Sequence, residues 1–181
     1  MFLRNWYKAL TAELYSDESV KAKNTDGTDT RLCASSASGG IYKVTSLTMA
    51  GKNSSLSSNN NVPYMGKVQK SYSYGGVILG TGDTAPSIDD YKLSGDLITT
   101  ISAIGDISVT QDDNGCTFEG IYSVTNSSSE DVTVKEIGLL MTGAYSGRFL
   151  VERTVLDTPV TIPAGGIGQV TYTIRMNYPT V

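Results

Sequence analysis

The feature that most constrains the fold is a series of alternating apolar and polar residues in the last third of the chain. Turns rich in Ser, Gly or Pro separate its segments, which are Cys116–Asn126, Val132–Met141, Arg148–Val155, the short Val160–Ile162 and Gln169–Tyr178. A period of two places one face of each segment against a core and the other towards solvent. Strands at this spacing, with turns between them, predict an antiparallel β-sandwich.

Further strand signals precede this series. They are Ile41–Met49, Lys67–Leu79, Asp96–Ile104 and Ile107–Gln111, and Asp113-Asn-Gly115 is typical of a hairpin turn into Cys116. Between the second and third of these segments, Gly80, Gly82 and Pro86 break the strand pattern, and the residues from Ser87 to Asp90 fit a single helical turn. We therefore predict one β-sandwich domain over residues 41–181.

The first residues show a helical rather than a strand period. Apolar side chains recur at spacings of three and four from Phe2 to about Tyr15, which predicts an amphipathic helix; they are Leu3, Trp6, Tyr7, Leu10 and Leu14. This apolar face either packs on the chain's own core or docks on a neighbouring subunit through its large aromatics. The polar stretch that follows indicates a connector with a short hairpin around Asp26-Gly27, so residues 1–40 form an N-terminal region.

Composition excludes several classes of function. The 181 residues include 14 Lys and Arg, 18 Asp and Glu and no histidine, for a formal charge of −4. The basic residues are scattered singly, which argues against a nucleic-acid surface. Without histidine the chain lacks the commonest general base and the commonest imidazole metal ligand. We expect no enzymatic activity, no cofactor and no metal site.

The chain carries no targeting or membrane signal that we recognise. Arg4, Asn5 and Lys8 interrupt the opening segment, so it does not resemble a secretory signal, and no later stretch reaches the roughly 18 apolar residues that a membrane span needs. We expect synthesis in a bacterial cytoplasm and no membrane partner. Cys33 and Cys116 are either free thiols or one long-range disulfide, and both alternatives stay open.

The carboxylates show no catalytic or metal-binding spacing. Candidate calcium ligands are Asp83, Asp89, Asp90, Asp106, Asp112, Asp113 and Asn114, but none of their runs matches the EF-hand alternation, so we interpret them as solvated turn and cap residues. Four glutamates fall where strand edges or solvent faces require charge: Glu119, Glu130, Glu136 and Glu152. Gly80-Thr-Gly82 lacks the remaining residues of a phosphate-binding loop.

Three segments resemble structural proteins of tailed bacteriophages. The first runs from Val77 to Leu93, as Val-Ile-Leu-Gly-Thr-Gly-Asp-Thr-Ala-Pro-Ser-Ile-Asp-Asp-Tyr-Lys-Leu. The second joins Lys135-Glu-Ile-Gly-Leu-Leu140 to the stretch from Leu150 to Arg175, and the third is the opening Leu3-Arg-Asn-Trp-Tyr-Lys-Ala-Leu10. The parts after Asn126 and after Ile162 are also similar to immunoglobulin-like modules, so the sandwich is expected to be immunoglobulin-like or jelly-roll-like.

The resemblance implies a non-enzymatic virion subunit that is present in many copies, as a head decoration, a neck or collar component or a tail component. Its implied partners are copies of itself and other virion structural proteins. We expect the interface residues to be those of the helical stripe, together with Tyr178 in the last strand, whose free edge Pro179 would blunt. The alternative is an adhesin-like module that binds a host-surface glycan through tyrosines and the loops at residues 51–61 and 142–147.

Overall fold

The computed structural model describes residues 1–15, 21–31, 68, 70, 72, 75–142 and 148–178. These residues form a mainly β, sandwich-like structure of two antiparallel sheets, which confirms the predicted class. The predicted strand Ile41–Met49 and the loop at residues 51–61 lie outside the described residues.

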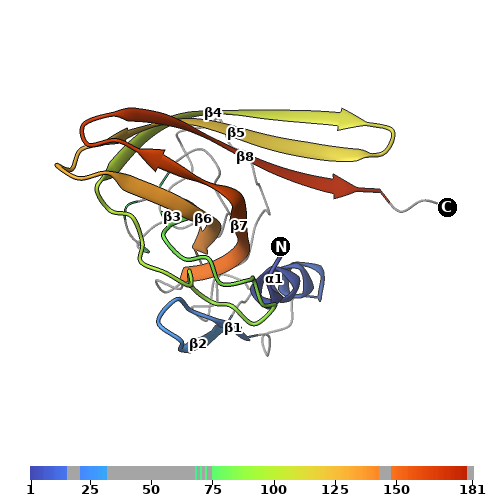
Figure 1. Ribbon diagram of the computed structural model, residues 1–181. Coiled ribbons are helices and arrows are strands. Elements are labelled where there is room, and N and C mark those ends of the chain that lie inside the picture. Colours follow the sequence, from blue (N-terminus) through green and yellow to red (C-terminus); the bar gives the residue numbers. More distant parts are fainter. Residues whose placement is uncertain are drawn as a thin grey trace, which may run out of the picture.

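Each of the two sheets has three strands. One has the order β3-β6-β7, with β3 at Gly76–Gly80, β6 at Val132–Thr142 and β7 at Arg148–Ile162. The other has the order β4-β5-β8, with β4 at Ile101–Asp112, β5 at Gly115–Asn126 and β8 at Ile167–Asn177. Figure 1 shows the second sheet lying across the first, with their inner faces opposed.

The core lies between the sheets, as the alternation predicts. In β8, for example, Val170, Tyr172 and Ile174 are buried while the residues between them are exposed. The facing sheet contributes a matching set of buried side chains, among them Val77, Leu79, Ile137, Leu139, Met141, Phe149 and Val151. Burial of this apolar surface is the main force that holds the two sheets together.

Strand β7 departs from the simple alternation. Leu139 pairs with Glu152 and Leu140 with Leu150, so Val151 is an extra residue, and it shifts the face on which the following side chains lie. A second irregularity follows Val155, where residues 156–159 have no partner in the register. The sequence pattern predicts two short strands here, but the structure has one long strand, because Pro159 falls in the unpaired stretch at a sheet edge.

The predicted hairpin between β4 and β5 is present, with a small difference in its turn. Asp112 pairs with Gly115, so Asp113 and Asn114 form the two-residue connection and Gly115 already belongs to β5. A Cβ atom at Gly115 would lie 2.4 Å from the carbonyl oxygen of Met176 in β8. Glycine is therefore used here for close strand packing rather than for the turn itself.

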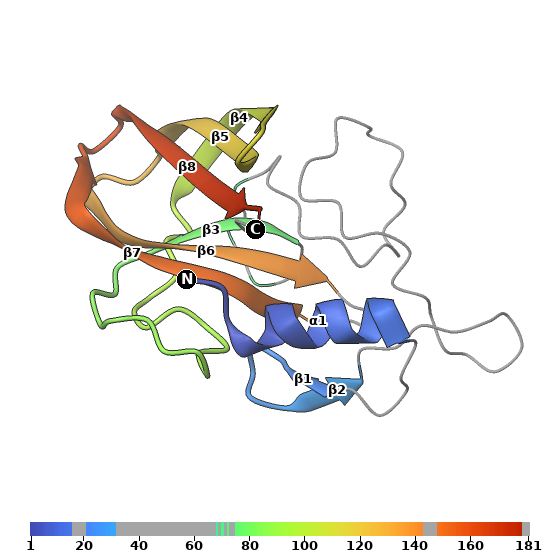
Figure 2. The same cartoon turned by 90° about the vertical axis from the view of Figure 1, so that its right-hand side faces the viewer.

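Helix α1, at Arg4–Tyr15, and the small hairpin of β1 (Lys21–Lys23) and β2 (Asp29–Arg31) lie beside β7 (Figure 2). This hairpin confirms the expected turn around Asp26-Gly27, with Gly27 at a φ of 88°. The side chain of Asn5 is buried and joins three elements: its amide nitrogen donates to the carbonyl oxygens of Lys23 (2.8 Å) and Leu150 (3.1 Å). Asn5 thereby fixes α1 to both β1 and β7.

The sheet of β4, β5 and β8 extends beyond the sheet it covers at one end. The hairpin end of β4 and β5 and the C-terminal end of β8 project past β7 (Figure 1). Exposure changes accordingly along β4, from Ile101, which is fully buried, to Val109, which is 49% exposed although it lies on the same face.

Candidate functional site

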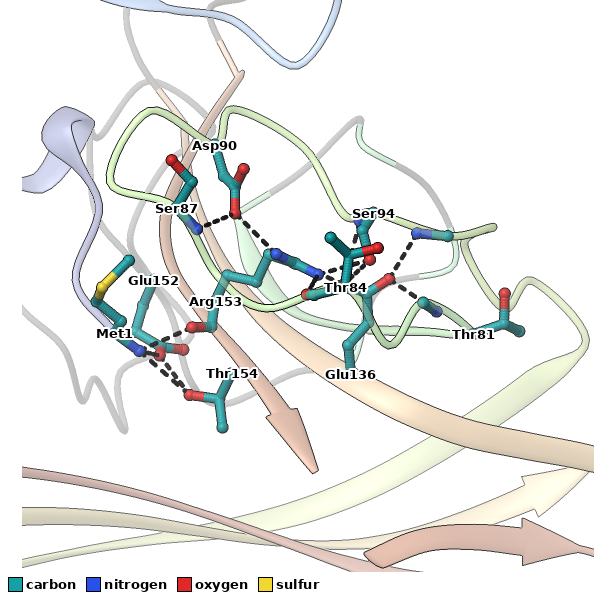
Figure 3. A network of polar contacts seen from close by, with 12 residues as sticks. Met1, Thr81, Thr84, Ser87, Asp90, Ser94, Glu136, Glu152, Arg153 and Thr154 are labelled. Atoms are coloured by element: carbon teal, nitrogen blue, oxygen red, sulfur yellow. Dashed lines mark hydrogen bonds and ion pairs between the residues drawn. The ribbon is translucent and has the colours of Figure 1, made fainter. Parts of the chain in front are cut away.

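Two of the three buried charged side chains in the described residues lie together, on the outer face of the β3-β6-β7 sheet. There Glu136 of β6 and Arg153 of β7 form an ion pair, with 2.7 Å between Arg153 Nε and Glu136 Oε2. The two are diagonal neighbours across the strand pair, because Arg153 lies opposite Gly138. The loop at residues 81–96 covers both side chains (Figure 3), so that the exposed fractions of the side chains are 1% for Arg153 and 0% for Glu136.

Both carboxylate oxygens of Glu136 accept hydrogen bonds from this loop. Oε1 accepts from the backbone N–H groups of Gly82 (3.0 Å) and Gly95 (2.8 Å). Oε2 accepts from the N–H (3.1 Å) and the hydroxyl (3.2 Å) of Ser94, in addition to Arg153. The carboxylate thus binds the two ends of the loop to each other and to β6.

The guanidinium of Arg153 also has a partner for each nitrogen. Nη1 donates to Asp90 Oδ2 at 2.7 Å, and Nη2 donates to the carbonyl oxygen of Thr84 at 2.7 Å and to the Ser94 hydroxyl at 2.5 Å. Asp90 in turn accepts from the N–H of Ser87 at 2.9 Å, which closes the turn predicted there. Asp90 and Thr84 lie in the middle of the loop, so Arg153 holds the part that Glu136 does not reach.

The electrostatics of the pair favour its charged form. Burial raises the pKa of the Glu136 carboxyl, but the N–H of Gly95, the bond from Arg153 and the N–H of Ser94 lower it more, so that the pKa falls below its ordinary value. Burial lowers the pKa of Arg153, yet the bonds to Glu136 and Asp90 reverse this and raise the pKa above its ordinary value. Both groups therefore stay ionised at neutral pH.

A second buried carboxylate lies on the opposite face of β7. The extra residue Val151 turns Glu152 towards the inside of the sandwich, where its Oε2 accepts a hydrogen bond from the hydroxyl of Tyr172. Its Oε1 accepts from the amino group of Met1 at 2.5 Å. Burial, followed by the charge of Glu152, raises the pKa of Tyr172 well above its ordinary value, so the phenol remains a neutral donor.

These two clusters correct one sequence prediction. Glu136 and Glu152 were expected at solvent faces or strand edges, but they are 0% and 4% exposed. A sequence signal for Glu136 does exist: the unbroken apolar run Ile137-Gly-Leu-Leu-Met141 indicates a strand that is buried on both faces. Since every oxygen of Glu136 and every guanidinium nitrogen of Arg153 is occupied, the arrangement holds a loop and presents no free acid, base or nucleophile.

The candidate calcium ligands do not come together among the described residues. Instead, single cations neutralise four of them: Asp83 pairs with Lys135, Asp89 with Arg4, Asp90 with Arg153 and Asp112 with Arg175. In the described part of the chain, no group of three or more His, Cys, Asp or Glu side chains is placed to hold a metal ion.

Among the described residues, no helix has the length and apolar character of a membrane span. Cys116 is a free, half-buried thiol, and Cys33 lies outside the described residues.

The structure places some of the six interface candidates in the core and others at the surface. Leu3 and Trp6 are 0% and 6% exposed, which places them in the chain's own core and leaves them no surface for a neighbour. Tyr7 and Tyr178 are 52% and 42% exposed, and the side chains of Leu10 and Leu14 are not among those described. The glycan-binding loops of the alternative, at residues 51–61 and 142–147, lie outside the described residues except for the backbone of Thr142.

The lowered pKa of Glu136 leads to a prediction about acid stability. Its contribution to stability is fully present above the pKa that it has in the unfolded chain, about 4.3, and is lost as the pH falls through the lower pKa of the folded state. Urea unfolding followed by Trp6 fluorescence should therefore show a smaller loss of stability on acidification for Glu136→Gln than for the wild type. Asp83→Asn is the control, because the exposed pair of Asp83 with Lys135 is screened by solvent and should leave the pH slope almost unchanged.

Comparisons of the chain with protein-family models, with curated proteins and with solved structures found no match.

Proposed function

We propose that this chain is a non-enzymatic structural subunit of a tailed-bacteriophage virion, which assembles in symmetric copies with itself and with other virion proteins. The proposal rests on the contacts that the buried side chains of Glu136 and Arg153 make. Glu136 and Arg153 are saturated by contacts that fix the loop at residues 81–96 on the sandwich. Buried charge that holds a loop in place has a structural role, whereas a catalytic acid or base needs a free proton site.

The segments that resemble phage structural proteins support the setting. Glu136 lies in the stretch Lys135–Leu140 and Arg153 in the stretch from Leu150, and both contact the loop that continues the first segment, Val77–Leu93. The first and second resembling segments are therefore joined in one contact network. We propose that the sandwich belongs to the immunoglobulin-like or jelly-roll-like class, and that the subunit serves as a head decoration, a neck or collar component or a tail component.

Sedimentation velocity combined with negative-stain electron microscopy tests the assembly role. Over a rising series of protein concentrations, we expect the full chain to form a discrete oligomer whose class averages show rotational symmetry. A single monomeric species at every concentration would overturn the self-assembly. The virion setting has its own test: mass spectrometry of purified phage particles from the source that carries the gene should detect the chain, and its absence from those particles would refute that setting.

A further inference from the structure

Strand β4 is the least protected sheet edge in the described part of the chain. It lies at the end of the order β4-β5-β8, and β5 is the only strand with which it pairs among the described residues. Its 12 residues pair one to one with β5 from Ile101 to Asp112, without a bulge. A long, regular edge of this kind offers a row of N–H and C=O groups to another strand.

The other edges carry protective features that β4 lacks. Strand β3 has only 5 residues, and isolated bridges to Val68 and Leu97 flank it. Strand β7 has two register irregularities and contains Pro159, and β8 carries the charged Arg175 near its end. The sequence of β4 contains no Lys, Arg or Pro, and its charged residues are Asp106 and Asp112. Bulges, prolines and charged side chains, lysine above all, are the usual means by which proteins keep an edge from pairing.

The geometry of the hairpin shows which backbone groups β4 presents. Asp112 and Gly115 close a two-residue connection, and such a closing pair exchanges hydrogen bonds. Counting back from Asp112, every second residue of β4 directs its N–H and C=O groups to β5. The residues between them direct these groups to the free edge. The edge groups are therefore those of Gln111, Val109, Ile107 and Gly105, and Val109 adds an apolar side chain that is 49% exposed.

We propose that two copies of this chain associate through β4, edge to edge and antiparallel, with Ile107 on the twofold axis. The proposal rests on the assembly role proposed above, and it names the surface that carries out that role. In this arrangement the two three-stranded sheets join into one sheet of six strands. Each open edge closes the other in a single isologous contact.

The register of β4 is compatible with a second copy as the occupant. With Ile107 opposite itself, the edge-facing residues pair with one another, and Val109 of one copy meets Gly105 of the other, where no side chain competes for space. No acidic residue of β4 then lies opposite another, because positions 106 and 112 face positions 108 and 102. A register centred one residue earlier would set Asp106 against Asp106, and like charges directly opposite one another destabilise a sheet.

Cysteine cross-linking tests the register. In a chain with Cys33 and Cys116 replaced by serine, Ile107→Cys should form a disulfide-linked dimer under mild oxidation, because a hydrogen-bonded pair has Cα atoms about 5.5 Å apart. Val109→Cys is the matched control. Its two copies would lie four residues apart along the strand, about 13 Å, which is too far for a disulfide, so this variant should remain uncross-linked.

A charge substitution tests the edge independently of the cysteine background. Val109→Lys should shift the sedimentation of the full chain from dimer towards monomer at equal concentration. Ile121→Lys is the control, because Ile121 is similarly exposed, at 41%, but lies in the central strand β5. This control should sediment like the wild type, and circular dichroism should show that both variants keep the β spectrum of the wild type.

The outcomes separate the two proposals. If the wild type does not self-associate at all, the assembly role itself fails. If the wild type assembles while Val109→Lys assembles equally well and Ile107→Cys gives no cross-link, only the β4 contact is wrong. Cross-linking of Val109→Cys in preference to Ile107→Cys would overturn the register that we propose.

Discussion

Arg153→Met is expected to lower the free energy of unfolding by about 3–5 kcal/mol, because it removes one partner of a buried ion pair and leaves the Glu136 carboxylate uncompensated. Methionine retains most of the apolar stem, so the loss reports the missing guanidinium rather than a large cavity. The loop at residues 81–96 also loses its bonds through Asp90 and Thr84. Urea unfolding monitored by the fluorescence of Trp6, which is buried, measures the change.

Arg175→Met is the matched control for this prediction. Arg175 also pairs with an aspartate, Asp112, but its side chain is 41% exposed, and solvent screens such a pair so that it contributes little to stability. The double variant Glu136→Gln, Arg153→Met should recover part of the loss, because the remaining buried amide is neutral. Equal small effects for Arg153→Met and Arg175→Met would show that the buried pair does not hold the loop.

Gly82→Ala is expected to cost about 3–5 kcal/mol, although it adds a single methyl group. A Cβ atom at this position would lie 2.0 Å from the Ser94 hydroxyl oxygen, 2.3 Å from the Gly95 nitrogen and 2.4 Å from Glu136 Oε1. Because no atom can occupy that space, the loop must move away from β6 and give up backbone bonds to the carboxylate. Chemical denaturation gives the size of the loss, and amide hydrogen exchange should show faster exchange at Gly95 and Ser94.

Gly165→Ala is the comparison that separates crowding from backbone strain. A Cβ atom at Gly165 would meet no atom within 4 Å, but its φ of +66° is a conformation that alanine adopts only at a cost of about 1–2 kcal/mol. We therefore expect a smaller loss here than for Gly82→Ala. The reverse order would indicate that the close contact between the loop and Glu136 is absent in solution.

Local pattern was sufficient for much of the β structure. Strands β5 and β8 have an alternation that can be read in the sequence, and a turn signal marks most ends of the strands from β5 to β8. The predicted break inside β7 failed because a proline was interpreted as the end of a strand, whereas Pro159 lies at a sheet edge where its missing N–H has no partner to lose. Edge position depends on the order of strands in the sheet, which alternation does not specify.

For a similar reason, the local sequence pattern could not predict the contacts of Glu136 and Arg153. Glu136 and Arg153 become neighbours only through the register of β6 and β7, and that register contains an extra residue at Val151. Loop residues from 41 to 69 positions away in the chain then complete the set of bonds. Likewise, the spacing of Leu3 and Trp6 in the sequence did not specify that β7 and the rest of the chain's own core would cover these two side chains.

We propose that the buried charges hold the scaffold together and perform no chemistry. The most direct test is an NMR titration of the Glu136 side-chain carboxyl carbon in the full chain, with Glu136→Gln used to assign the signal. We predict a pKa below the ordinary value for a glutamate, as expected for a carboxylate that accepts bonds from Gly82, Gly95, Ser94 and Arg153. A pKa raised towards neutrality would contradict the account, because it would reveal a carboxyl group poised to exchange a proton.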